Sequence, residues 1–208
     1  MNLGKSAQRS GTRRNVLAGF SIIELLVSIL VMLVLTVIAI PSLMRSLHAY
    51  QLNSAAGRVS DMLKYARFEA VRRNKQLNFL AQASGPNWVV GTDSNNSGAL
   101  DATEKQETIA GYVALLPAGA PVPTGNAISA ALGGAALTTM SGANGSITFD
   151  ARGAIRQAIG GAISNNVDVF YVGNAVDTDP GYRAVVLLPS GSVQIWTSPN
   201  GGPWRQVQ

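Results

Sequence analysis

Residues 93–104 have the residue types and the spacing of a calcium-binding loop. Counted from Asp93, oxygen-bearing side chains occupy positions 1, 3, 5, 9 and 12, a glycine occupies position 6 and an apolar residue position 8. Calcium takes oxygen ligands from alternate residues of such a loop, and the glycine permits the sharp turn between them. The candidate ligands are Asp93, Asn95, Ser97, Asp101 and Glu104. The flanks are strand-like and not helical, and any exposed turn favours the same residue types, so a plain hairpin loop is the alternative.

Catalysis has few candidate residues in this sequence. His48 is the only histidine, and there is no cysteine. A Ser-His-Asp triad or a multi-histidine zinc site is hard to build from one histidine, and cysteine-based metal or redox chemistry is excluded. No glycine-rich phosphate loop follows a strand-like run, and no nucleophile and base stand in the setting of a known catalytic motif. We therefore predict a protein that is not an enzyme and needs no cofactor, with calcium as the one candidate ion.

Three arginines are the candidates for a DNA-binding patch, provided that folding brings Arg152, Arg156 and Arg183 together. The formal net charge of +5 is a poor guide, because four basic residues and no acidic one lie before residue 20, which leaves 12 basic and 11 acidic residues after it. Beyond Asn74 there are six basic and eight acidic residues, so no basic surplus exists there to contact phosphates. DNA is thus an unlikely partner by composition, and only a spatial cluster would change that.

A lone carboxylate, Glu24, lies in an apolar run of twenty-one residues from Phe20 to Ile40. A helix of that length, at about 1.5 Å per residue, spans a hydrocarbon core of roughly 30 Å. A charged side chain at depth costs about 2.5–3.5 kcal/mol, so Glu24 is a functional candidate. The basic leader before the span predicts that the leader stays in the cytoplasm and that the rest of the chain lies outside. The run is too long for a secretory signal peptide, and an ordinary single-span anchor is the alternative.

The segment Gly19-Phe20-Ser21-Ile22-Ile23-Glu24-Leu25-Leu26 resembles the processing motif of type IV pilins and type II secretion pseudopilins. The resemblance implies cleavage by a prepilin peptidase between Gly19 and Phe20, followed by N-methylation of Phe20. It also implies that Glu24 pairs with the methylated terminal amine of a neighbouring subunit, and that Pro41 kinks the helix. An ordinary anchor would not explain a glutamate four residues after a Gly-Phe junction.

Beyond Pro41 an apolar stripe at helical spacing predicts that the helix continues to about residue 75, with Asn74 as its stop. The stripe comprises Leu52, Ala55, Ala56, Val59, Met62, Leu63, Ala66 and Ala70. The opposite, solvated face is predicted to carry Arg58, Asp61, Lys64, Glu69, Arg72 and Arg73. The run from Ala66 to Arg73 also resembles the Ala-Arg-x-Glu-Ala-x-x-Arg signature of GspH/FimT-type minor pseudopilins and minor pilins.

From residue 76 onward short β-prone runs separated by turn residues replace the helical period. They are residues 77–81, 88–91, 108–115, 146–149, 167–172, 182–188 and 192–197. They predict antiparallel sheets, possibly two, packed against the helix. Residues 117–145 are read as a long loop insert, with a short helix near 128–132. DNA-uptake members of the family carry a Gly-Arg-x-Arg motif, and the matching stretch here, Gly191-Ser192-Val193-Gln194, has neither arginine.

The sequence therefore predicts an α+β, pilin-like protein. A leader (1–19) precedes a long helix (20–75) whose first part, 20–40, is transmembrane, and a β-rich GspH/FimT-like head (76–208) follows. The predicted function is that of a minor pilin or pseudopilin, assembled near the tip of a type IV pilus or a type II secretion pseudopilus. Its predicted partners are other pilins, the prepilin peptidase and the membrane. It would be anchored in the inner membrane with its head in the periplasm until its extraction into the filament.

Overall fold

The computed structural model describes residues 20–109, 112–115, 124–140, 144–174 and 176–207. The predicted leader, Gly19 included, lies outside the described residues. The chain divides into two compact units, one ending at Ser42 and one running from Leu43 to Gln208. A long helix, α1 (Ile22–Arg73), contributes to both units.

In the first unit, α1 is an apolar helix with no buried side chain. Every described residue from Phe20 to Ser42 is exposed. A helix satisfies its backbone hydrogen bonds internally, which is what an apolar segment requires in a setting without water. Pro41 lies inside α1, and the helix continues through it. The kink predicted at Pro41 stays a prediction.

In the second unit, α1 ends where the sequence predicted. Asn74 has a φ of +51°, its N–H donates to the carbonyl of Val71, and the N–H of Lys75 donates to the carbonyl of Ala70. These bonds form a Schellman motif, in which a left-handed residue closes the last helical turn. Asparagine adopts that conformation more readily than most residues. The predicted stop at Asn74 is confirmed.

One sheet of the second unit has the strand order β3-β2-β1-β6-β7, with antiparallel neighbours. Its strands are β1 (Leu77–Ser84), β2 (Asn87–Asp93), β3 (Gln106–Ile109), β6 (Asn144–Phe149) and β7 (Ile155–Arg156). β1 and β2 form a hairpin whose last pair is Ser84 with Asn87. The loop that follows β2 is the candidate calcium loop.

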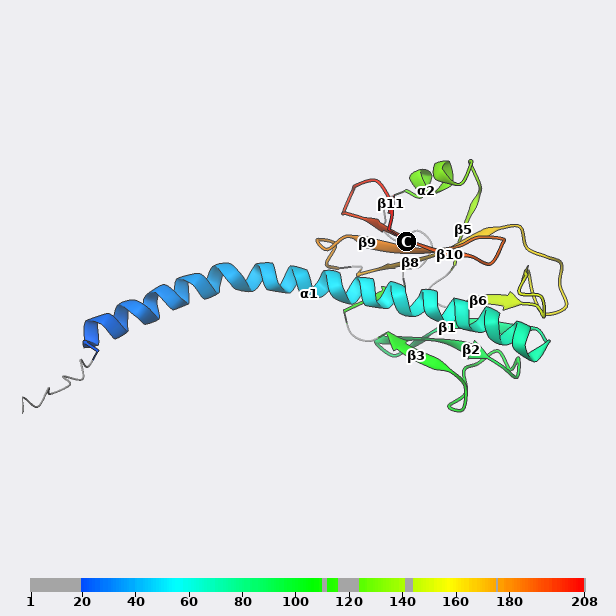
Figure 1. The fold of residues 1–208 in the computed structure, drawn as a ribbon, viewed down its shortest axis with the longest axis horizontal. Coiled ribbons are helices and arrows are strands. Elements are labelled where there is room, and N and C mark those ends of the chain that lie inside the picture. The colour runs from blue at the N-terminus through cyan, green and yellow to red at the C-terminus, as the bar shows by residue number, and fades with distance from the viewer. Residues whose placement is uncertain (1–19, 110–111, 116–123, 141–143, 175, 208) are drawn as a thin grey trace, which may run out of the picture. The chain divides into compact units, whose positions relative to one another are not determined.

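The other sheet has the order β11-β10-β9-β8-β4, and β5 pairs with β8 in parallel. Its strands are β4 (Ala114–Leu115), β5 (Leu137–Thr139), β8 (Val167–Gly173), β9 (Tyr182–Leu187), β10 (Val193–Ser198) and β11 (Arg205–Gln206). A short helix, α2 (Asn126–Ala131), lies beside this sheet (Figure 1). The two sheets, which are antiparallel apart from the β5–β8 pair, confirm the predicted architecture of the head.

The second half of α1 packs its apolar stripe into the main hydrophobic core. Every residue of the predicted stripe is at most 3% exposed, and the stripe packs with apolar side chains of both sheets. β8 alternates as its sequence predicts: Phe170 and Val172 belong to this core, whereas Val169 and Tyr171 belong to a second cluster with Ile128 of α2. The sheet of β8 and β9 is therefore covered on both faces.

Three local predictions were wrong. The run 108–115 is not one strand: β3 pairs with β2 and β4 pairs with β8, so its two ends join different sheets. The insert 117–145 was predicted as a loop with one short helix, but it also contains the strand β5. The predicted helix near 128–132 is confirmed as α2, whose Ile128 is fully buried. Glu69, assigned to the solvated face of α1, is 3% exposed. In each case contacts distant in sequence override a local pattern.

Candidate assembly site

The first candidate site is the exposed apolar segment at the start of α1. Among the helices of the described residues, α1 is the only one that is long and apolar enough to cross a membrane, judged by length and composition. Phe20 and Ile22 are about 80% exposed, and the exposure of large apolar side chains continues along the segment. A continuous apolar surface of this length is unstable in water, so it needs lipid or another apolar surface around it.

Glu24 is the one charged residue in this segment. Its backbone carbonyl accepts a hydrogen bond from Ser28 Oγ at 2.7 Å, and its carboxylate has no partner among the described residues. Phe20 is described and precedes the first helical residue, Ile22. Because Gly19 lies outside the described residues, the cleavage between Gly19 and Phe20 stays a prediction. The pairing of Glu24 with the terminal amine of another subunit also stays a prediction.

In the second unit, the signature run of α1 forms the contact between the helix and the turns of both sheets. Arg67 Nε donates to the carbonyl of Gly153, at 3.0 Å, and Nη1 donates to the carbonyl of Gly191, at 3.2 Å. Gly153 lies in the turn between β6 and β7, and Gly191 lies in the turn between β9 and β10. One guanidinium thus ties a turn of each sheet to the helix. A Cβ at Gly191 would lie 2.6 Å from Arg67 Nε, and Gly191 has a φ of +78°, so both the close approach and the left-handed backbone favour glycine.

Glu69, two residues after Arg67, is a buried carboxylate paired within the chain. Arg72 donates to both of its oxygens, at 2.6 and 2.7 Å, and Arg73 donates to Oε1. The hydrogen bonds from Arg72 hold the pKa of Glu69 at about 2, against the opposing effect of desolvation. The signature therefore has a structural role: Arg67 holds turns, and Glu69 is neutralised by the arginines of the last helical turn.

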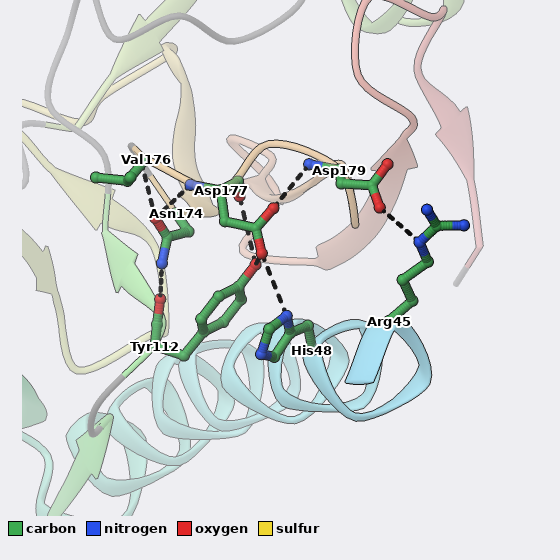
Figure 2. A network of polar contacts seen from close by, with 7 residues as sticks. All are labelled: Arg45, His48, Tyr112, Asn174, Val176, Asp177 and Asp179. Carbon is green, nitrogen blue, oxygen red and sulfur yellow. Dashed lines mark hydrogen bonds and ion pairs between the residues drawn. The ribbon is translucent and has the colours of Figure 1, made fainter. Parts of the chain in front are cut away.

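A polar network joins α1 to the loop between β8 and β9 (Figure 2). Asp177 Oδ2 accepts a hydrogen bond from the Tyr112 hydroxyl at 2.6 Å and lies 3.2 Å from His48 Nδ1. The rings of His48 and Tyr112 stack at 3.8 Å, and Arg45 Nε lies 2.9 Å from Asp179 Oδ2. The Tyr112 hydrogen bond lowers the pKa of Asp177. Of these residues only His48 stood out in the sequence, because no local pattern connects residues so far apart.

The calcium loop is closed by hydrogen bonds of its own. The Asp93 carboxylate accepts the N–H groups of Ser97 and Gly98, at 3.0 and 2.8 Å, and Asp101 Oδ2 accepts from Asn95 Nδ2 at 2.7 Å. Glu104 accepts the N–H of Asp101 at 3.0 Å. Among the described residues, no group of three or more His, Cys, Asp or Glu side chains could hold a metal ion. Calcium binding stays a prediction, which calorimetric titration with calcium tests.

The three arginines considered for DNA do not form the one patch that DNA binding would require. Arg156 donates to Asp150 through Nε and Nη2, at 3.1 and 2.9 Å. Arg183 is 8% exposed, and its Nε donates to Asn53 Oδ1 at 2.6 Å. Arg152 is exposed and adjoins Gly153, which Arg67 contacts. Asn53 and Arg67 are about fourteen residues apart on α1, roughly 20 Å at 1.5 Å per residue, so Arg183 and Arg152 lie far apart.

One further carboxylate, Asp168 of β8, has a perturbed environment. It is 5% exposed, and desolvation raises its pKa to about 6. No hydrogen bond or ion pair to its carboxylate is present among the described residues. Desolvation without a nearby opposite charge disfavours the charged form of a carboxyl group, which accounts for the direction of this shift.

An apolar, exposed N-terminal helix that continues as the buried spine of an antiparallel β head defines a pilin-type subunit. The chain matches the family described as type II transport protein GspH over residues 55–191, more than half of its length. It belongs to the GspH family. The match begins at Ala55 in the apolar stripe of α1 and ends at Gly191, the glycine bound by Arg67.

Among solved structures, the chain is similar to the crystal structure of the type IV minor pilin FimU from Pseudomonas aeruginosa strain PAO1. The identity is 18%, the TM-score is 0.46, and the similarity covers 76% of this chain and 94% of that one. Comparison with curated proteins gives no match.

Proposed function

We propose that this chain is a minor pilin or pseudopilin subunit, which assembles through its N-terminal helix into a type IV pilus or a type II secretion pseudopilus. The observation that carries the proposal is the fully exposed apolar segment from Phe20 to Ser42, with its single carboxylate, in a chain of the GspH family. Lipid shields such a segment before assembly, and neighbouring helices shield it afterwards. The proposed role is mechanical, in protein secretion or pilus biogenesis, and not catalytic.

Glu24 gives this assembly its specificity. Cleavage by the prepilin peptidase between Gly19 and Phe20 would expose a new amine on Phe20, which is then methylated. A buried carboxylate without a partner is strongly unfavourable, and an opposite charge within a few ångströms offsets part of that cost. The amine of a neighbouring subunit supplies that charge, so a helix in register with another helix is favoured over a helix surrounded by lipid.

The proposed topology follows from the charges of the leader. Basic residues before the span hold the leader in the cytoplasm, so the head folds in the periplasm. The subunit remains in the inner membrane until it is extracted into the filament, where a minor subunit belongs at or near the tip.

The replacement of Glu24 by valine tests the pairing. We expect Glu24→Val to insert into the membrane like the wild type but to be depleted from sheared filaments at least about tenfold, because a change of 1.4 kcal/mol in subunit association is already tenfold. Quantitative blots of the membrane and filament fractions measure both. Thr36→Val, which removes another polar side chain from the same exposed segment, is the matched control and should assemble normally. Wild-type amounts of Glu24→Val in filaments would refute the pairing role.

The replacement of Gly19 tests the processing. Gly19→Val should block cleavage and leave only the precursor in the membrane, because a bulkier residue stands at the scissile bond. The size of the protein on a blot, with and without the peptidase, measures this. A mature-sized band from the variant would count against the peptidase assignment.

A further inference from the structure

The head has a groove beside the exposed side of α1, next to the turns that Arg67 ties together. It is lined by Lys64, Arg67, Phe68, Val71, Arg152 and Gly191, and its volume is about 300 Å³. All of these residues belong to the second unit. Ligand pockets usually measure about 300–1,000 Å³. The groove is at the lower limit of that range, so it suits one or two side chains better than a whole small molecule.

The groove presents two large apolar side chains to solvent. Phe68 is 63% exposed and Val71 is 48% exposed, whereas the apolar stripe of the same helix is at most 3% exposed. The other exposed large apolar residues of α1 among the described residues end at Tyr50. Full burial of such a side chain contributes about 1.5–3 kcal/mol, so a partner that covers both would gain appreciable binding free energy.

The charge around these two side chains is positive. Lys64 is on the same side of α1, Arg152 is exposed in the turn opposite, and Arg67 is fixed by its bonds to the carbonyls of Gly153 and Gly191. Asp61 lies 3.7 Å from Lys64, and its side chain is 80% exposed, so this pair is largely screened by solvent. Glu69 is already held by Arg72 and Arg73.

We propose that this groove docks an acidic segment with an apolar side chain from the head of a neighbouring pilin-type subunit. The acidic groups would face Lys64 and Arg152, and the apolar side chain would cover Phe68 and Val71. This inference rests on the proposed function, since it names a second contact, on the head, between subunits that first associate through their helices. Electrostatic complementarity of this kind selects among partners and fixes their register more than it adds affinity.

Nucleic acid fits the groove less well than an acidic protein segment. A phosphate backbone needs a row of free cations, and Arg156, four residues after Arg152, is held by Asp150. Arg183 is buried beside Asn53, away from the groove. The apolar pair Phe68 and Val71 matches an apolar side chain better than a row of phosphates.

Site-specific photo-crosslinking in assembling cells tests the proposal with the full-length chain. p-Benzoylphenylalanine replaces Phe68, a conservative change at an exposed position. After irradiation, mass spectrometry of the adduct identifies the partner and the crosslinked residue. We expect an adduct with a different pilin-type subunit, recognised by its own Gly-Phe processing motif, at an acidic, apolar-bearing segment of its head.

The charge requirement is tested with two exposed arginines. Arg152→Glu should lower the adduct yield at least about tenfold, because like charges placed across an interface cost several kcal/mol. Arg205→Glu, on β11, is the matched control and should leave the yield unchanged. Equal yields in the two variants would overturn the proposal.

Other outcomes separate this inference from the proposed function. An adduct only with a second copy of this chain, or only with nuclease-sensitive material, overturns the inference. The absence of an adduct while the labelled chain is present in sheared filaments also overturns it and leaves the assembly function standing. If neither the labelled nor the wild-type chain enters filaments, both proposals fail.

Discussion

The two halves of α1 solve the same problem, the burial of an apolar helix surface, in different ways. In residues 22–42 no side chain is buried within the chain, whereas after residue 50 a narrow stripe is buried against two sheets. The two glutamates of the helix show the same difference. Glu69 is paired with arginines one turn away, and the carboxylate of Glu24 has no partner among the described residues. The half without an internal partner is the proposed assembly surface, and the half with one is the scaffold of the head.

The same substitution in the two halves gives the sharpest test of this difference. Ala66 is fully buried at the contact with the sheets, and Ala39 is exposed. Ala66→Leu should destabilise the head by about 1–3 kcal/mol, because extra methylene groups overpack a filled core. Ala39→Leu should leave the stability of the head unchanged. Chemical unfolding of the detergent-solubilised protein, followed by tryptophan fluorescence, measures both. Equal effects would mean that the two halves do not differ as described.

Arg67 tests whether the signature of the second half is structural. Arg67→Ala should destabilise the head by about 1–3 kcal/mol, because the removal of one partner leaves the carbonyls of Gly153 and Gly191 without their hydrogen bonds. Arg67→Lys keeps the charge but cannot reach both carbonyls with the planar fork, so its loss should be intermediate. Thermal unfolding of the three proteins gives the order. An Arg67→Ala protein whose head is as stable as that of the wild type would contradict the role of Arg67 in linking the two turns.

Glu69 gives a smaller effect that depends on pH. Its folded pKa of about 2 is below the ordinary 4.5, so its ion pairs stabilise the head above pH 4.5. That contribution, about 1–2 kcal/mol after allowance for the exposure of Arg72 and Arg73, is lost as the pH falls from 4.5 towards 2. The difference in unfolding free energy between wild type and Glu69→Gln, measured from pH 7 to pH 3, should narrow on acidification. A constant difference across that range would show that the carboxylate acts only through its shape.

The local periodicity of the sequence could predict both halves of α1. Spacing of three and four residues identifies a buried stripe without any knowledge of what covers it, and all eight stripe residues are buried. Asn74 could likewise be predicted as the end of the helix, because the left-handed cap depends on a single residue type. The exposed apolar segment and its lone carboxylate could be found for the same reason: they are properties of consecutive residues.

Contacts between distant residues could not be predicted, because no local pattern encodes them. Arg67 binds carbonyls 86 and 124 residues away, and Arg183, a candidate for DNA, is instead bound to Asn53 across 130 residues. Only tertiary structure decided that Glu69 is buried, since its helical position lies at the margin between the stripe and the solvated face. The sequence by itself determined which helix half needs a partner outside the chain. The packing of the two sheets on the other half determined that Arg67 binds the turns and that Arg183 binds Asn53. It thereby determined that Lys64 and Arg152 are the exposed cations beside Phe68 and Val71.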